Sequence, residues 1–164
     1  MTFFTEGNTN GMNMLSGVPD SLTNGADYTF SVFAKYDSVR YIVIGQHLAG
    51  SEQRWAWFDL QNGVIGTVGN LAHAAMVPVG GNGVYRCMVV TACTTDSYKA
   101  FDIALATTDN TKSYLGTLTN GNIIAGAQVR SGGLDGALSY VTTQGTSFSL
   151  TGGGDLVLDE GDLS

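Results

Sequence analysis

Two segments decide the fold of this chain: FDLQNGVIG at residues 58–66 and PVGGNGVYRCMV at residues 78–89. Each places an Asn-Gly or Gly-rich turn next to an alternating apolar run, which is the sequence pattern of an antiparallel hairpin. Neither segment is a recognisable catalytic motif. They therefore predict a β-rich binding or structural module.

Alternating apolar residues predict further strands on both sides of these hairpins. The clearest is 27–36, where Tyr28, Phe30, Val32 and Ala34 fall on one face. Other strands are predicted at 39–46, 54–60, 64–68, 84–91, 98–106, 114–118, 122–130, 137–141, 146–150 and 156–158. The only helical candidate is 71–76, which is short and lacks a convincing cap. Consecutive short strands predict an all-β, antiparallel two-sheet sandwich, with a jelly roll as the favoured topology.

The composition narrows the class of function. The chain has 164 residues, which fits one domain, and charged residues make up only 13%, about half of the usual 25%. A surface of Thr, Ser, Asn, Gln and Gly is typical of rigid extracellular or virion β-proteins and suits sugar contact. A net charge of −7 with seven scattered basic residues argues against a nucleic-acid partner. No apolar stretch approaches the roughly 20 residues of a membrane span.

The sequence divides into three predicted parts. Residues 1–25 are predicted to be an irregular arm, 26–150 the sandwich domain, and 151–164 an acidic tail. No signal peptide is predicted at the start. Cys87 and Cys93 lie in one extended run, about 20 Å apart, and are predicted to be free thiols of a protein made in a reducing cytoplasm.

Several segments carry a resemblance to a known family. They are DYTFSVFAKY (27–36), VRYIVI (39–44), AWFDLQNGVIGTVG (56–69), VPVGGNGVYRCMVV (77–90), and IIAGAQVRSG (123–132) leading into LSYVTT (138–143). In order and spacing they resemble the jelly-roll, carbohydrate-binding-module-like domain of bacteriophage tail fibres, head fibres and other virion proteins. The resemblance covers roughly residues 26–145.

The resemblance implies a non-enzymatic virion structural protein, exposed as a capsid decoration, head-fibre or tail-fibre component. It would be made in the host cytoplasm and lie on the virion surface. The implied partners are other virion proteins and copies of itself, as homotrimers. Apolar residues of the arm, Phe3, Phe4 and Met14, are the candidates for docking on neighbouring subunits.

Trp55 and Trp57 are the strongest candidates for ligand contact. On a strand they point the same way and could offer an aromatic surface to a sugar ring, with Gln53, Arg54 or Gln61 supplying hydrogen bonds. This supports an alternative function, a carbohydrate-binding adhesin that recognises host surface glycans. The competing interpretation, which is favoured, is that both rings belong to the core.

Catalytic and metal sites are weaker hypotheses. A hydrolase would need two facing carboxylates, for which Asp59, Asp102 and Glu52 are candidates, but solvent-facing or turn-capping roles are favoured. His47 and His73 have no ligand spacing, and Cys87 is predicted to be a buried, inert thiol. No cofactor is predicted. A structural calcium ion is a minor alternative for the acidic group Asp155, Asp159, Glu160 and Asp162, which is favoured as a solvated tail.

Overall fold

The computed structural model describes residues 1–17, 22–46, 53–93, 100–134, 148–150 and 154–156, the last two segments by their backbone alone. A five-stranded sheet has the order β1 (Thr2–Thr5), β12 (Gly121–Ser131), β4 (Asp27–Lys35), β9 (Val84–Ala92) and β8 (Ala72–Val79). A second sheet has the order β14 (Gly154–Leu156), β13 (Phe148–Leu150), β3 (Met14–Gly17), β10 (Phe101–Ala106), β5 (Tyr41–Gln46), β6 (Trp55–Asp59) and β7 (Val64–Val68). A two-stranded ribbon joins β2 (Asn10–Met12) to β11 (Ser113–Leu115).

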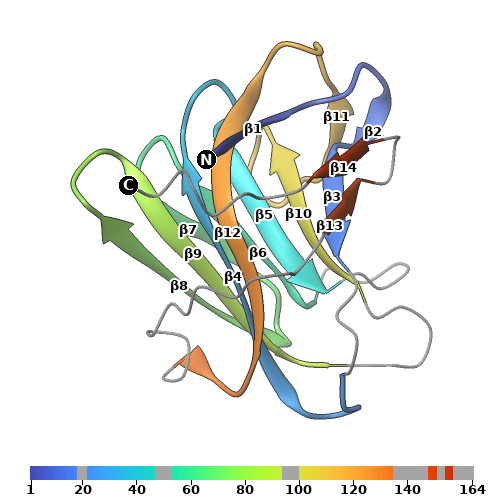
Figure 1. The fold of residues 1–164 in the computed structure, drawn as a ribbon, viewed down its shortest axis with the longest axis vertical. Helices are drawn as coiled ribbons and strands as arrows, with labels where there is room; N and C mark the ends of the chain where they lie inside the picture. The colour runs from blue at the N-terminus through green and yellow to red at the C-terminus, as the bar shows by residue number, and fades with distance from the viewer. Residues whose placement is uncertain (18–21, 47–52, 94–99, 135–147, 151–153, 157–164) are drawn as a thin grey trace.

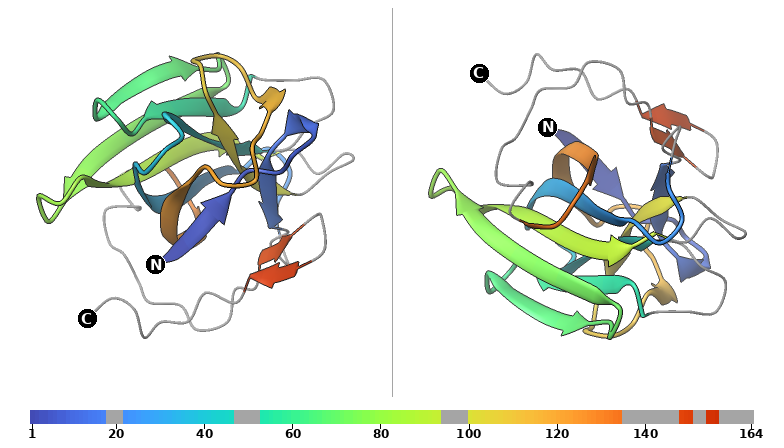
Figure 2. Two further views of the ribbon diagram at one scale, coloured as in Figure 1. Left: turned by 90° about the horizontal axis from the view of Figure 1, so that it is seen from above. Right: turned by 90° about the horizontal axis from the view of Figure 1, so that it is seen from below.

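The two large sheets are antiparallel and pack face to face, which confirms the predicted all-β sandwich (Figure 1). The chain passes directly from one large sheet to the other between β3 and β4, β4 and β5, β7 and β8, β9 and β10, and β12 and β13. The jelly-roll assignment stays a prediction. Strands β13 and β14 lie on the opposite side of the molecule from β7 and β8 (Figure 2). Within the described part of the chain, no helix is long and apolar enough to cross a membrane.

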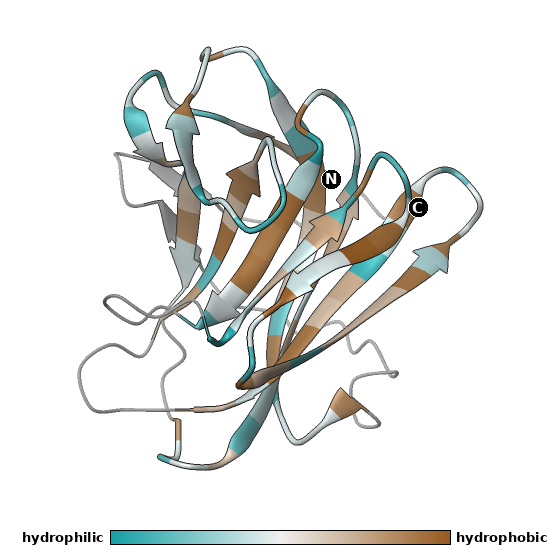
Figure 3. Cartoon of the chain, turned by 180° about the vertical axis from the view of Figure 1, so that it is seen from behind, coloured by the Kyte–Doolittle hydropathy of each residue, from teal (hydrophilic) through white to brown (hydrophobic). Residues whose placement is uncertain are grey.

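The main core lies between the sheets, and alternation along the strands builds it. Phe30 and Val32 of β4 point inward and are fully buried. Phe101 and Ile103 of β10 point inward and are buried in the same way. The rings of Phe30 and Phe101 meet with centroids 5.4 Å apart. Full burial of one such side chain stabilises the fold by about 1.5–3 kcal/mol. Figure 3 shows apolar segments along the central strands, whereas the connections are more polar.

The predicted hairpin turns are confirmed. The Asn62-Gly63 turn joins β6 to β7, and Gly63 has a φ of +68° that suits glycine. A Cβ at Gly63 would collide with the Tyr85 hydroxyl of β9, so the turn also packs against the other sheet. The turn between β8 and β9 uses Gly80, Gly81 and Gly83 with φ near +70°.

The first residues are not irregular, so the prediction that they contain no clear strand is wrong. Thr2–Thr5 pairs antiparallel with β12, and Met14–Gly17 pairs with β10. Phe4 and Leu15 are buried in the main core. These strands are short and rich in Gly and Asn, and their partners lie about a hundred residues later in the sequence, so local periodicity did not reveal them. The division of the chain at residues 25 and 150 stays a prediction.

The predicted helical candidate at 71–76 is also wrong, because this segment belongs to β8. Its residues Ala72 to Met76 pair with Thr91 to Cys87 of β9. A helix this short gains little from the helix propensity of alanine, whereas Ala72 and Met76 pack against the main core from a strand. Tertiary pairing therefore overrides local propensity.

A buried asparagine fixes the crossing between β4 and β5. The Asn122 side chain on β12 donates to the Val39 carbonyl at 2.7 Å and accepts from the Asp37 amide at 3.1 Å. Ser38 adds reciprocal hydrogen bonds with the Gly121 backbone. The connection thus has partners for its backbone groups where it leaves one sheet for the other.

Candidate functional site

The two tryptophans lie on the outer face of the seven-stranded sheet, away from the main core. Inward-pointing Ala56 and Phe58 alternate with them along β6. They form a second cluster, here called the aromatic cluster, whose members are Tyr41, Val43, Trp55, Trp57, Ala104 and Ala106, with Met14 packed against it. Trp55 is 1% exposed and Trp57 is 0% exposed. The apolar packing of this sheet is therefore two-sided.

The connection between β10 and β11, residues 107–112, contacts both rings. The Trp57 indole Nε1 donates a hydrogen bond to the Thr111 carbonyl at 3.0 Å. The Lys112 ammonium lies 4.0 Å from the centroid of the Trp55 ring, which is cation–π geometry. The Trp55 indole N–H is buried without a hydrogen-bond partner among the described residues. The indole N–H of Trp57 is thus hydrogen-bonded, whereas the Trp55 ring meets a cation on its face but has no hydrogen-bond partner for its N–H in the described part of the chain.

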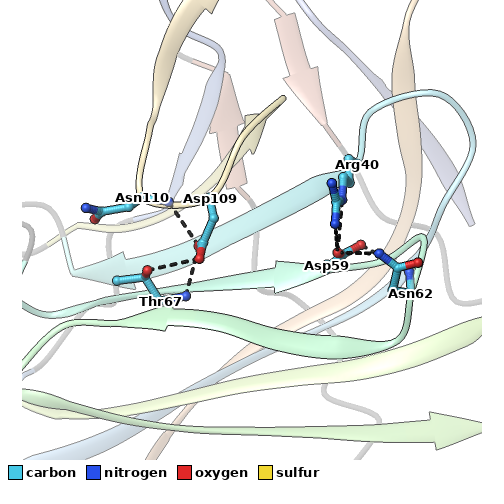
Figure 4. A network of polar contacts seen from close by, with 6 residues as sticks. All are labelled: Arg40, Asp59, Asn62, Thr67, Asp109 and Asn110. Atoms are coloured by element: carbon cyan, nitrogen blue, oxygen red, sulfur yellow. Dashed lines mark hydrogen bonds and ion pairs between the residues drawn. The ribbon is translucent and has the colours of Figure 1, made fainter.

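A carboxylate fastens this connection to the edge of the sheet. Asp109 accepts hydrogen bonds from the Thr67 amide at 2.8 Å and the Thr67 hydroxyl at 3.0 Å (Figure 4). It also accepts from the Asn110 amide at 2.9 Å, and Asn110 has a φ of +57°. A Cβ at Gly66 would come within 2.6 Å of the Asp109 carboxylate, so glycine leaves room for this contact.

The candidate sugar-binding residues are not gathered into one exposed site. Trp55 and Trp57 are buried, and their rings offer no open surface in this conformation. Gln53 and Arg54 precede β6 while Gln61 follows it, so they lie at opposite ends of the strand. The Arg54 guanidinium donates to the Ala92 carbonyl at 3.1 Å. The sugar-binding role stays a prediction, and it requires residues 107–112 to move.

Asp59 caps the Asn62-Gly63 turn and pairs with Arg40. Its Oδ2 accepts from the Arg40 Nη2 at 2.7 Å and from the Asn62 side chain at 2.8 Å, and its Oδ1 accepts from the Asn62 amide (Figure 4). Burial opposes the charged form, but the hydrogen bonds from Arg40 and Asn62 outweigh it and hold the pKa of Asp59 below its ordinary value. Burial, helped by the Asp59 charge, raises the pKa of Tyr41. The turn-capping interpretation of Asp59 is confirmed.

Asp102 is fully buried, so its predicted solvent-facing position is wrong. It shares the outer face of the sheet with Asp59, because both alternate with inward-pointing residues. Strand β5 lies between the two carboxylates. Asp102 of β10 pairs with Gly45 of β5, and Asp59 of β6 pairs with Tyr41 of β5. Four residues along and two strands across place these carboxylates about 17 Å apart, beyond the 5–9.5 Å or so of glycosidase pairs. Glu52 lies outside the described residues.

The remaining candidates take structural positions where they are described. Cys87 and Cys93 form no disulfide, as predicted, and Cys87 is buried, also as predicted. Cys93 is buried too and accepts a hydrogen bond from the Gln46 side chain at 3.2 Å. Burial raises the pKa of the Cys87 thiol. His73 is exposed on β8. Among the described residues no cluster of His, Cys, Asp or Glu could hold a metal ion. His47 and the tail residues Asp159, Glu160 and Asp162 lie outside the described residues, as does the side chain of Asp155.

The predicted arm residues separate into buried and exposed ones. Phe4 is buried in the main core and Met14 packs on the aromatic cluster. Phe3 is 42% exposed. It belongs to a set of exposed apolar residues at the N-terminus, in β1, β2 and β11, and in the connection after β11. This set is here called the N-terminal apolar surface: Met1, Phe3, Met12, Leu115 and Leu118. These elements lie toward one end of the molecule (Figure 1).

A polar contact holds the connection that presents Leu118. The buried Glu6 carboxylate accepts from the Thr117 amide at 3.1 Å and hydroxyl at 2.8 Å, and the Glu6 amide donates to the Asn120 carbonyl. Leu118 is 56% exposed and has a φ of +68°, an unfavourable backbone conformation for leucine. The contact thus maintains an apolar side chain in solvent at a conformational cost.

Sequence reasoning missed Leu115 and Leu118. Their exposure depends on the ribbon formed by β11 with β2, which is a pairing of distant segments. Comparison with known protein families finds no family model that matches the chain, and comparison with curated proteins finds no significant match.

Proposed function

We propose that this chain is a non-enzymatic structural protein of a bacteriophage virion, displayed on the particle as a capsid decoration, head-fibre or tail-fibre component. The observation that carries the proposal is the N-terminal apolar surface on a rigid β-sandwich. Apolar side chains that gather at one end and stay exposed indicate a protein contact. The resemblance of residues 26–145 to virion jelly-roll domains supplies the kind of partner, a neighbouring virion protein.

The structure changes which residues should make that contact. Phe3 remains a candidate, while Phe4 and Met14 are replaced by Met12, Leu115 and Leu118, because the former two are packed within the chain. Removing residues 1–15 would take away β1, β2 and Leu15 of the core. Single substitutions on the N-terminal apolar surface are therefore the better test.

The experiment measures the amount of this chain in purified phage particles produced from the genome that encodes it. Antibodies against the chain should label the outside of intact particles. Leu118→Gly and Phe3→Ser should reduce incorporation at least tenfold while the purified variants stay folded. Asn82→Ser, in the exposed turn after β8, is the control and should incorporate normally. Particles without the chain would contradict the proposal.

The second candidate function is glycan binding, and one observation favours it. Trp55 and Trp57 lie on the outer face of a sheet, and only residues 107–112 are seen to bond their rings. A sugar could stack there after this connection moved, and the free indole N–H of Trp55 could then donate to it. A glycan array on the wild-type chain and on Asp109→Ala tests this. Sugar binding that increases in the variant supports an adhesin.

A further inference from the structure

Both sheets end on the same side of the molecule in strands with one free edge. Among the described strands, β8 pairs with β9 alone and β7 pairs with β6 alone. The two strands follow one another in the chain and contact each other across the sandwich. They lie together on the side away from β13 and β14 (Figure 2). We call residues 64–79 the β7–β8 edge.

This edge lacks the usual protection against pairing with another chain. Natural edge strands commonly carry charged side chains, which prevent such pairing. From Leu60 to Tyr85 the sequence contains no Asp, Glu, Lys or Arg, although the chain has a net charge of −7. His73 is the only titratable side chain within the β7–β8 edge. The edge therefore contributes no charge of its own on an acidic molecule. The Asp109 carboxylate contacts it at Thr67 of β7, so the uncharged part of the edge is β8.

Apolar side chains are exposed along the same edge. Half of the large apolar side chains that the structure leaves exposed lie here: Val64, Ile65, Leu71, Val77 and Val79. A single exposed apolar residue is normal, but a group beside two free strand edges indicates a protein interface. The remaining exposed members form the N-terminal apolar surface, at a separate site.

Pro78 indicates which backbone groups of β8 face outward. A proline fits in an edge strand where its missing N–H would point away from the sheet. Because backbone direction alternates along a strand, the N–H and C=O groups of Ala74 and Met76 then point to the free edge. The Ala72 amide follows the same alternation, since it bonds to the Gly69 carbonyl rather than to β9. The free edge thus offers two donors and two acceptors in its centre.

We propose that β8 pairs antiparallel with β8 of a second copy of this chain, across a twofold axis at Ala75. In this register Ala74 exchanges two hydrogen bonds with Met76 of the partner subunit, and the symmetric pair forms two more. Val77 then faces His73 of the partner subunit, and Val79 faces Leu71 of the partner subunit. Val79 is thereby paired with an exposed apolar side chain, and Val77 packs against an imidazole ring.

The net charge of the chain favours a second copy of this chain as the partner at the free edge of β8. Two chains that each carry −7 repel one another over most of their surfaces. Strand β8, which has no Asp, Glu, Lys or Arg, is a place where they can meet without bringing charged side chains of that strand into contact. A partner of opposite charge would find no complementary group between Leu60 and Tyr85. The inference does not depend on the proposed virion role, because it concerns the purified chain.

Sedimentation equilibrium of the full chain tests the proposal. We expect a monomer–dimer equilibrium, and Ala75→Lys should raise the dimer Kd at least tenfold, because it places two ammonium groups against each other at the axis. Leu115→Lys, the same change on the N-terminal apolar surface, should leave the Kd unchanged. Circular dichroism establishes that both variants are folded.

Disulfide trapping tests the register without relying on a destabilising charge. Ala75→Cys should cross-link to itself under mild oxidation, since directly opposed residues of such a pair have Cα atoms about 4.5–5.5 Å apart. Val79→Cys alone should not cross-link, but should do so with Leu71→Cys in the same chain. A monomer at every concentration, a trimer, or equal cross-linking of Ala75→Cys and Val79→Cys overturns the proposal.

Discussion

The aromatic cluster and the β7–β8 edge are both apolar and both lie outside the main core, but only the first is covered by the chain itself. Residues 107–112 bond to Trp57 and Trp55 and are fastened through Asp109. No described strand pairs with the free edge of β8. The face of a sheet can be covered by a connection, whereas a free strand edge without charged side chains is a template for another strand, so the uncovered region indicates association.

The largest expected effect separates the two regions by stability. Trp57→Ala should lower the free energy of unfolding by about 3–5 kcal/mol, because it leaves a cavity in the aromatic cluster and frees the Thr111 carbonyl. Val79→Ala on the β7–β8 edge should change it by less than about 0.5 kcal/mol in the monomer. Urea unfolding at low protein concentration measures both. Equal losses would contradict the comparison.

A pH experiment tests the ion pair beside the aromatic cluster. Asp59→Asn should lower the free energy of unfolding at neutral pH by about 1–3 kcal/mol, because the charged acceptor of Arg40 is lost. The folded-state pKa of Asp59 lies below its unfolded value. Its contribution is therefore present above about pH 3.9 and is lost as the pH falls through the folded pKa.

Urea unfolding of the wild type and the Asp59→Asn variant between pH 2 and pH 7 measures this dependence. The difference between the two proteins should shrink as the solution becomes acidic. A difference that grows below pH 4 would show that the carboxylate is not stabilised in its charged form. Arg40→Gln, which removes the partner, should show a weakened pH dependence of the same sign.

A smaller effect is expected from loosening the cover of the aromatic cluster. Asp109→Ala removes the hydrogen bonds to Thr67 and should cost about 1 kcal/mol. Acrylamide should then quench the fluorescence of the two tryptophans more strongly. Thr107→Ala, an exposed change in the same connection, is the control. Unchanged quenching would mean that the contacts of Thr111 with Trp57 and of Lys112 with Trp55 are enough to hold residues 107–112 in place.

The smallest expected effect is a gain in stability on the N-terminal apolar surface. Leu118→Gly should raise the free energy of unfolding by about 0.5–1 kcal/mol, because glycine adopts a positive φ without the leucine penalty. Thermal unfolding measures the change. Thr119→Gly lies next to it at an ordinary φ and should not be stabilising. A lower free energy of unfolding for Leu118→Gly would mean that the leucine side chain packs within the chain.

Much of the fold could be predicted because many of its strands show alternating apolar residues or a turn motif within a short stretch of sequence. The alternation of 27–36 identified β4, and the Asn62-Gly63 turn identified the β6–β7 hairpin. The N-terminal strands could not be predicted, since Thr2–Thr5 becomes a strand only by pairing with β12, which lies far away in the sequence. The strand at 72–79 was hidden because its alanines have helix propensity and its pairing with β9 decides its structure.

The candidate site was predicted less well, because exposure depends on distant segments. Alternation places Trp55 and Trp57 on one face of β6 correctly, but the segment that contacts them begins about fifty residues later. The same limit applies to Phe3 and Phe4, which are neighbours with opposite exposure. By contrast, the uncharged stretch from Leu60 to Tyr85 is visible in the sequence alone, and only the topology shows that it forms an edge.

The hydrogen bonds of Asn122 also constrain when the protein can fold during synthesis. The Val39 carbonyl that its side chain secures is translated 83 positions earlier. At a translation rate of about 5–20 residues per second, this interval lasts about 4–17 seconds. Throughout it the nascent β4–β5 crossover lacks its buried partner, and chaperones could bind the exposed apolar strands. Closure of the sandwich is therefore a late event on the ribosome.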